Sequence, residues 1–178
     1  MIDFSNILDS DPNAIHRSYQ KGDIIQKAES SRTSSVYVKK GILRSYTIDS
    51  NGKEHIYAFA LEGYFIGDLE AIEFNQNAQL FIDCIENSEV ILFDQERLLA
   101  NLSKQEVILF NQLLRRSIGK LQRRVLMLMG APAQDRYLYF LETYPNLLNR
   151  IPQKMIASYL GIAPQTLSTI RRKISDSK

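Results

Sequence analysis

Short runs of branched and aromatic residues dominate the chain from about residue 22 to residue 93. Glycines separate these runs, and the break at Asp49-Ser50-Asn51-Gly52 predicts a hairpin because Asn and Gly adopt positive φ at low cost. Several short strands at this spacing predict a β-barrel or a β-sandwich. The runs that carry the prediction are 36–38, 42–48, 55–60, 80–85 and 90–93.

The apolar period changes after Phe93. From Glu106 to Gly130 apolar residues recur every three or four positions, which predicts one long helix with a narrow apolar stripe. More apolar residues, at 108, 109 and 113, lie on an adjoining face. Two apolar faces need two partners, so we expect the helix to join two copies of the chain; packing of the stripe on the strand domain of its own chain is the alternative. The predicted stripe comprises Val107, Phe110, Leu114, Ile118, Leu121, Val125 and Leu128.

Three shorter helical patterns follow. The first runs from about Ala133 to Tyr144, the second starts near Pro152 and is broken by Gly161, and the third starts near Pro164. Two helices joined by a tight turn that contains glycine predict a helix-turn-helix, with a buried helical hairpin that does not touch DNA as the alternative. The predicted inward faces comprise Ile156, Ala157, Leu160, Leu167, Ile170 and Ile174.

The outward face of the last predicted helix is polar and cationic. Gln and Arg can make paired hydrogen bonds with adenine and guanine edges, and Ser and Thr are adaptable, so this face predicts base contacts with double-stranded DNA. Helix amino termini and nearby cations attract phosphate groups. We predict base reading by Gln165, Ser168, Thr169 and Arg172, and phosphate binding by Lys154, Arg171 and Lys173.

The charge along the chain supports a polyanionic partner. The net charge is only +2, but residues 1–110 carry 10 Lys and Arg against 17 Asp and Glu, whereas residues 111–178 carry 12 against 3. Such asymmetry favours nucleic acid as the partner of the carboxyl-terminal half. The alternative is a solvated helix face formed by Arg115, Arg116, Lys120, Arg123 and Arg124.

Composition and motif content exclude other classes of protein. No apolar run approaches the ~20 residues that cross a bilayer, and the segment Met1-Ile2-Asp3-Phe4 is acidic where a signal peptide is basic, so we expect a cytoplasmic protein without membrane contact. Cys84 is the only cysteine, which is too few for a cysteine-ligated iron–sulfur cluster, and His16 and His55 lack metal-ligand spacing. No partnered nucleophile, phosphate loop or metal triad is present, so we expect no catalytic residues, no metal and no enzymatic activity.

The whole chain resembles the Crp/Fnr family of bacterial regulators. The resemblance extends over nearly all residues and is most specific in the predicted helix-turn-helix. It implies an α+β fold with an antiparallel, cyclic-nucleotide-binding-like β-barrel of jelly-roll type at 1–102, a dimerisation helix at 103–130 and a helix-turn-helix domain at 131–178. The motifs that carry it are Lys21-Gly22-Asp23, Val38-Lys39-Lys40-Gly41, Gly52-Lys53-Glu54, Glu62-Gly63-Tyr64-Phe65-Ile66-Gly67-Asp68, Ile156-Ala157-Ser158-Tyr159-Leu160-Gly161-Ile162 and Thr166-Leu167-Ser168.

The resemblance implies a homodimeric transcription regulator with an effector pocket in each barrel. Two-fold symmetry then requires a roughly palindromic DNA site with half-sites about 34 Å apart. RNA polymerase becomes a candidate partner. Pro164 and Thr169 stand where well-known members have cationic residues near the bases, so the target sequence does not carry over.

The predicted sensor departs from cyclic-nucleotide-binding members of the family. Gly67 and Asp68 fit the start of their phosphate cassette, but the arginine that follows about a dozen positions later is missing, and no Lys or Arg lies between Lys53 and Arg97. A buried phosphate would lack its charge partner, so we expect no cyclic nucleotide cofactor. The residues that could line a pocket for another effector, or simply fill the barrel, are Tyr57, Phe59, Phe65, Gly67, Asp68, Leu80 and Ile82.

A second functional interpretation stays open. The chain could be a ligand-binding or protein-interaction module that does not bind DNA, with the basic charge serving solubility. The two interpretations differ in the salt dependence of binding, because only contacts with DNA phosphates release condensed counterions.

Overall fold

The computed structural model describes residues 4–176 and divides into two compact units, Met1–Leu109 and Phe110–Lys178. The boundary falls inside the long helix, so the division predicted at residues 102 and 130 stays a prediction. Three of the four amino-terminal residues used to predict localisation lie outside the described range. Across residues 4–176 no helix is both long enough and apolar enough to span a membrane.

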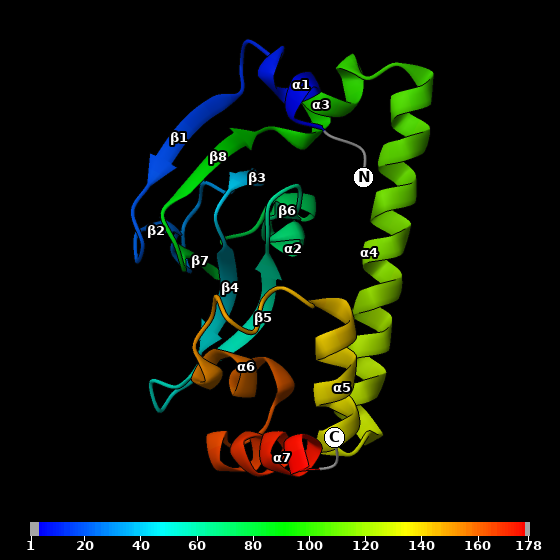
Figure 1. The fold of residues 1–178 in the computed structure, drawn as a ribbon. Coiled ribbons are helices and arrows are strands. Elements are labelled where there is room, and N and C mark those ends of the chain that lie inside the picture. The colour runs from blue at the N-terminus through cyan, green and yellow to red at the C-terminus, as the bar shows by residue number, and fades with distance from the viewer. Residues whose placement is uncertain (1–3, 177–178) are drawn as a thin grey trace. The chain divides into compact units, whose positions relative to one another are not determined.

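The first unit is built on two antiparallel four-stranded sheets with the strand orders β1-β8-β3-β6 and β2-β7-β4-β5 (Figure 1). Strands adjacent in a sheet are mostly distant in sequence, as the predicted jelly-roll fold requires. The strands are β1 (Ile15–Tyr19), β2 (Ile24–Gln26), β3 (Ser35–Lys40), β4 (Leu43–Ile48), β5 (Glu54–Ala60), β6 (Phe65–Ile66), β7 (Phe81–Cys84) and β8 (Ser88–Phe93). The short helices are α1 (Ser5–Asp9), α2 (Leu69–Glu73) and α3 (Gln95–Asn101).

The five predicted strand runs correspond to β3, β4, β5, β7 and β8, and the hairpin between β4 and β5 is confirmed. Its turn is closed by the Gly52 amide, which donates to the Asp49 carbonyl at 2.9 Å, and Gly52 has φ of +76°. The sequence prediction missed β1, β2 and β6. Strand β1 lies at a sheet edge and has no buried residue, so no alternating pattern marks it, and the other two are only three and two residues long.

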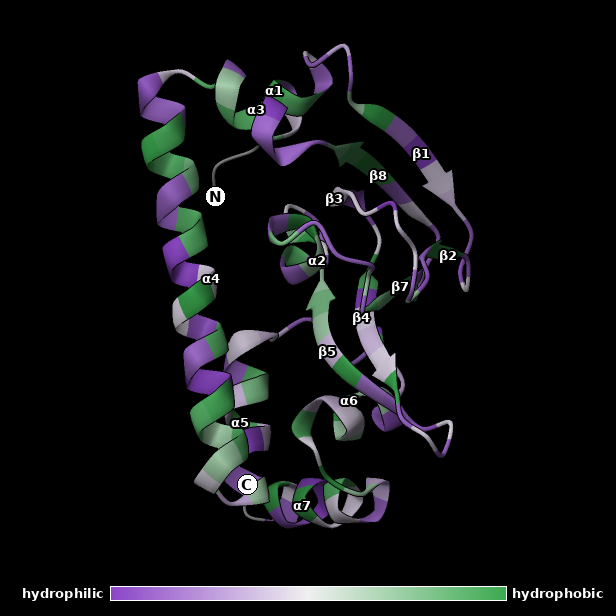
Figure 2. Ribbon diagram, turned by 180° about the vertical axis from the view of Figure 1, so that it is seen from behind, coloured by the Kyte–Doolittle hydropathy of each residue, from purple (hydrophilic) through white to green (hydrophobic). Residues whose placement is uncertain are grey.

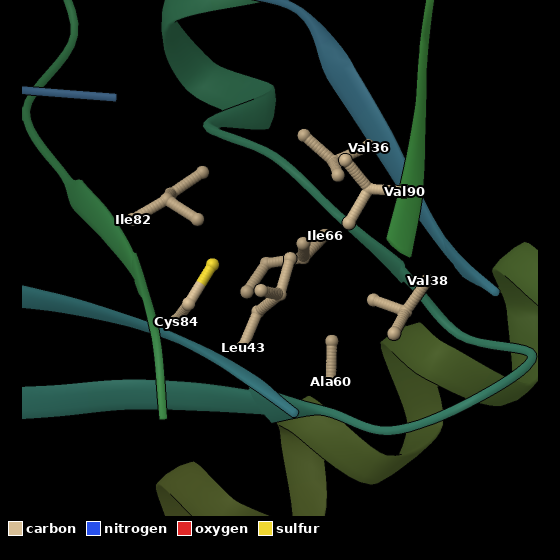
Figure 3. Packing of buried hydrophobic residues seen from close by; sticks show 8 residues of the cluster. All are labelled: Val36, Val38, Leu43, Ala60, Ile66, Ile82, Cys84 and Val90. Carbon is tan, nitrogen blue, oxygen red and sulfur yellow. The ribbon is translucent and has the colours of Figure 1, made fainter. Parts of the chain in front are cut away.

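The core of the first unit lies between the two sheets (Figure 3). Val36 and Val38 of β3 face Leu43 of β4 and Ile82 and Cys84 of β7, and all five side chains are almost completely buried. Burying an aliphatic side chain of this size contributes about 1.5–3 kcal/mol. Burial also raises the pKa of the Cys84 thiol to about 11, so this cysteine stays protonated and unreactive at neutral pH.

The remaining helices are α4 (Lys104–Gly130), α5 (Ala133–Thr143), α6 (Gln153–Leu160) and α7 (Pro164–Asp176). Helix α4 starts two residues before the predicted position because Ser103 and Glu106 form a capping box. The Ser103 amide donates to the Glu106 carboxylate at 2.7 Å, and the Glu106 amide donates to the Ser103 hydroxyl at 3.4 Å. Helices α5, α6 and α7 pack on one another around buried aromatic and aliphatic side chains, which include Tyr137, Phe140, Leu147 and Ile151.

Candidate nucleic-acid interface

A tight glycine turn connects α6 to α7. Gly161 has φ of +65° and ψ of 35°, the left-handed conformation that favours glycine at the end of a helix. Its amide donates to the Ser158 carbonyl at 3.1 Å, and the Ile162 amide donates to the Ala157 carbonyl at 3.0 Å. Pro164 then begins α7, and the φ that the proline ring fixes suits a first helical turn. This is the predicted helix-turn-helix geometry.

The buried faces of these two helices match the predicted stripe. Ile156, Ala157 and Leu160 of α6 and Leu167 and Ile170 of α7 are buried, and Ile174 near the end of α7 is half-buried. The opposite face of α7 is exposed. It carries the four predicted base-reading residues, Gln165, Ser168, Thr169 and Arg172.

Two hydroxyl groups on this face donate to the helix itself. The Ser168 hydroxyl donates to the Pro164 carbonyl and the Thr169 hydroxyl to the Gln165 carbonyl, both at 3.1 Å. Their protons are thus directed toward the helix backbone, and their oxygens remain acceptors on the exposed face. The face therefore combines acceptor hydroxyls with the donor and acceptor groups of Gln165 and the donors of Arg172, which is the chemistry that reads base edges in a major groove.

The predicted phosphate-binding residues differ in exposure. Lys154 lies exposed in the first turn of α6, where Pro152 provides no side-chain cap for the free amides. Lys173 is exposed in the last part of α7, whereas Arg171 is half-buried on its flank. Lys154 thus combines an exposed ammonium group with free helix amides, which is the chemistry that attracts anions.

The apolar stripe on α4 is exposed in its carboxyl-terminal half. The exposed fractions are 63% for Ile118, 38% for Leu121, 46% for Val125 and 37% for Leu128. The ribbon of α4 alternates apolar and polar bands along its length (Figure 2). Val107 and Leu114 are half-buried, and Phe110 is 4% exposed. Phe110 is thus buried in the single chain, and its role in a dimer interface stays a prediction.

The basic residues of α4 are not a uniform solvated face. The Arg123 guanidinium lies 4.7 Å from the centre of the Tyr139 ring in α5, and the Arg124 guanidinium lies 4.2 Å from that of Tyr159 in α6. Part of the charge that suggested DNA binding therefore supports the packing of α4, α5 and α6. Sequence spacing could not reveal these pairs, because each joins residues 16 or more positions apart.

In the first unit, the carboxylate of Asp68 is buried and bound to the backbone of its own segment. It accepts hydrogen bonds from the backbone amides of Ala71 at 3.2 Å, Gln79 at 2.7 Å and Leu80 at 2.9 Å. The first contact caps α2, and the other two close the segment between α2 and β7. Asp68 was predicted, with Gly67, as an effector-pocket residue. In the structure its carboxylate joins the start of α2 to the residues just before β7.

The other predicted pocket residues do not lie on one surface. Phe59 and Asp83 both pair with Arg44, whereas Ile82 points into the core with Leu43. Because neighbouring residues of a strand point to opposite faces, Phe59 lies on the outer face of its sheet. A bulge in the β4–β5 pairing shifts the alternation next to Tyr57, which is 41% exposed. Leu80 is half-buried beside the cassette.

Phe65 also lies outside the core between the sheets. It pairs with Tyr37 at a ring-centre distance of 5.1 Å and contacts Phe4 and Phe93, each at 5.5 Å. Its neighbour Ile66 points inward to the core. The predicted pocket residues therefore do not share one face of a sheet, and their part in binding an effector stays a prediction. Phe59 and Phe65 are aromatic yet lie outside the core between the sheets, so residue type did not reveal which face they occupy.

One buried cation of the first unit is held on the outer face of the second sheet. The Arg44 guanidinium makes two hydrogen bonds of 2.8 Å with Asp83 and two further contacts with Glu54, and it lies 4.2 Å from the centre of the Tyr46 ring. Burial disfavours its charged form, but the hydrogen bonds with the two carboxylates outweigh this and raise the pKa of Arg44. The positive charge of Arg44 is thereby balanced by the carboxylates of Asp83 and Glu54.

Comparisons with known proteins agree with this geometry. Residues 16–105 match the family model of the cyclic nucleotide-binding domain. The chain is 30% identical to the fumarate and nitrate reduction regulatory protein of Yersinia pestis, over 96% of this chain and 73% of that protein, and 29% identical to the Vibrio cholerae protein of the same name, over 89% and 68%.

Solved structures of regulators share the fold. The global regulator CLP of Xanthomonas campestris, described as responsive to c-di-GMP, has a TM-score of 0.74 at 13% identity over 98% of this chain and 91% of its own. A Crp/Fnr-family transcriptional regulator from Thermus thermophilus has a TM-score of 0.67 at 17% identity, over 92% and 87%. With the sensor-domain match, the related regulators and the helix-turn-helix in place, the chain belongs to the Crp/Fnr family of DNA-binding transcription regulators.

Proposed function

We propose that the protein acts as a homodimer on a roughly palindromic DNA site, with α7 of each copy in a major groove. The observation that carries the proposal is the two-sided character of α7. Leu167 and Ile170 anchor it, while Gln165 and Arg172 are exposed on the opposite side. In a symmetric helix-turn-helix dimer the half-sites lie about 34 Å apart.

The exposed part of the α4 stripe supports dimerisation. Ile118, Leu121, Val125 and Leu128 follow steps of three and four residues, so they form a continuous apolar line along the helix. Packing this line against its symmetry mate would remove apolar surface from water in both copies. RNA polymerase remains a candidate partner. We also propose that the protein catalyses no reaction, because its relatives are transcription regulators.

We further propose that the input to the sensor is not a cyclic nucleotide. A cyclic phosphate buried in the cassette needs a cation, and the chain has no Lys or Arg between Lys53 and Arg97. The acid at the start of the cassette, Asp68, already accepts three backbone hydrogen bonds. Arg44 is occupied by Asp83 and Glu54.

The salt dependence of binding tests DNA recognition. If Lys154, Arg171 and Lys173 of both copies each neutralise one phosphate, six counterion contacts predict a slope of about −5 in a plot of log affinity against log salt concentration. Affinity should then fall by about 1,000-fold between 50 and 200 mM salt. Fluorescence anisotropy with DNA recovered from the genome by the purified protein measures this. Binding that does not respond to salt would favour the protein-interaction alternative.

Two single substitutions should separate base reading from phosphate binding. Arg172→Ala should cost about 1–3 kcal/mol on the preferred site and relax sequence preference, because Arg172 is exposed among the predicted base-reading residues. Lys154→Ala should weaken all sequences alike and reduce the salt slope by about 1 per protomer. Titrations with the preferred and a scrambled site check both. Equal effects of the two substitutions on both sites would contradict the division of roles.

A further inference from the structure

We infer that Arg124, assisted by Arg136, is a positioning residue that attaches the helix-turn-helix to the end of α4. In the dimer this attachment would set the spacing between the two recognition helices. The inference rests on the proposed function, since spacing matters only when two copies bind one DNA site. It concerns residues that do not lie on the exposed face of α7.

Arg124 makes two kinds of contact with α6 at once. Its guanidinium plane lies 4.2 Å from the centre of the Tyr159 ring, and its Nη2 atom donates to the Tyr159 carbonyl oxygen at 3.1 Å. Tyr159 is 7% exposed and also contacts the rings of Phe140 and Tyr144, with ring-centre distances of 5.6 and 5.9 Å. Arg124 of α4 is thereby joined to the aromatic core between α5 and α6.

Arg136 makes the equivalent connection from α5. Its Nη1 atom donates to the Leu160 carbonyl at 3.0 Å, and its Nε atom donates to the Ala131 carbonyl at 3.0 Å. Ala131 lies in the connection between α4 and α5. Two successive carbonyls at the end of α6, those of Tyr159 and Leu160, therefore accept from cations of the two preceding helices. Carbonyls at a helix carboxyl terminus lack partners within the helix and carry partial negative charge, which makes this cationic capping favourable.

The capped carbonyls immediately precede the turn that starts α7. A side chain at Gly161 would place its Cβ 3.3 Å from Cδ2 of Leu128 in α4 and 3.6 Å from Nη1 of Arg136. The turn is therefore enclosed by α4 and by the Arg136 guanidinium. A change in the direction of α4 would be transmitted to the turn through these contacts rather than absorbed by a loose connection.

Arginine is the residue that can make both contacts of Arg124. A planar guanidinium stacks on a ring while its edge donates, whereas a lysine ammonium is a point charge without this fork. Loss of the attachment should leave α7 able to read one half-site, because the buried side chains of Leu167 and Ile170 still anchor α7. It should lower the affinity gained when both half-sites are engaged together, because that gain depends on a fixed geometry.

Binding to DNA sites of varied spacing tests the inference. The variant Arg124→Met is compared with the wild-type protein and with Arg116→Met, which removes the same charge from an exposed position of α4. The probes are duplexes with one half-site, and palindromes whose spacer changes in steps of one base pair. For Arg124→Met we expect nearly unchanged affinity for the single half-site, a loss of about tenfold at the best spacing, which is about 1.4 kcal/mol, and a flatter dependence on spacing. For Arg116→Met we expect the wild-type spacing profile.

The result that overturns the inference is a wild-type spacing profile for Arg124→Met, or an equal loss on single and paired half-sites. If the wild-type protein itself binds no DNA, the proposed function fails instead, which keeps the two failures distinct. Arg124→Lys serves as the second variant should Arg124→Met not fold, and circular dichroism identifies that case. Lysine keeps the charge but lacks the planar guanidinium, so Arg124→Lys should also flatten the dependence of affinity on spacing. A wild-type dependence on spacing for a folded Arg124→Lys protein would equally overturn the inference.

Discussion

Replacing Leu121 by Glu should convert the proposed dimer to a monomer and lower affinity for a palindromic site by about 100-fold or more. Leu121 is 38% exposed and lies within the exposed carboxyl-terminal half of the apolar stripe on α4. In a two-fold symmetric pair of helices the introduced carboxylates would come close together in an apolar seam, where a charge without a partner is strongly unfavourable. Analytical ultracentrifugation measures the oligomeric state, and anisotropy titration measures affinity for the palindrome.

The neighbouring substitution Gln122→Glu is the matched control, because it adds the same charge at an exposed position outside the stripe. It should stay dimeric and lose only a small part of its affinity for DNA. The two interpretations of the stripe predict different results for Leu121→Glu. If α4 packed only on its own chain, the substitution would lower the melting temperature without changing the oligomeric state, and that outcome would refute the dimer seam.

Asp68→Ala should reduce the free energy of unfolding of the first unit by about 3 kcal/mol. The substitution leaves three backbone amides, those of Ala71, Gln79 and Leu80, without their buried acceptor, and each unsatisfied group costs about 1–3 kcal/mol before water relieves part of the loss. Urea unfolding followed by far-ultraviolet circular dichroism measures the change, analysed separately for each transition if the two units unfold apart.

Glu73→Ala provides the control for Asp68→Ala, because it removes an exposed acid from the same short helix and should change stability by less than about 0.5 kcal/mol.

The same unfolding assay tests the proposal that cyclic nucleotides do not bind. A ligand that binds the folded state raises the unfolding midpoint, so cyclic AMP at millimolar concentration should leave the wild-type midpoint unchanged. A clear rise with cyclic AMP would contradict the proposal that the input is not a cyclic nucleotide. An Asp68→Ala protein as stable as the wild type would contradict the structural role assigned to Asp68.

The sequence was most informative where function depends on local periodicity. The exposed face of α7 follows from residues 165, 168, 169 and 172 alone, because a helix brings positions three and four apart to one side. The glycine turn at Gly161 and the hairpin at Gly52 were predictable for a similar reason, since left-handed backbone favours one residue type. The strand prediction was weaker where strands were short or exposed on both faces, as in β1.

The sequence by itself determined the fold class, the helix-turn-helix, the polar face of α7 and the absence of Lys and Arg between Lys53 and Arg97, because these depend on residue type and on spacing along the chain. Only the tertiary structure decided which face of each sheet Phe59 and Phe65 occupy, that Asp68 closes its own segment, that Phe110 is covered, and that Arg124 is joined to Tyr159. The faces of Phe59 and Phe65 and the Arg124–Tyr159 contact depend on pairings between elements distant in sequence, and the Asp68 contacts depend on how the segment between α2 and β7 folds back. Such pairings are chosen by the packing of the whole unit, and no local pattern records them.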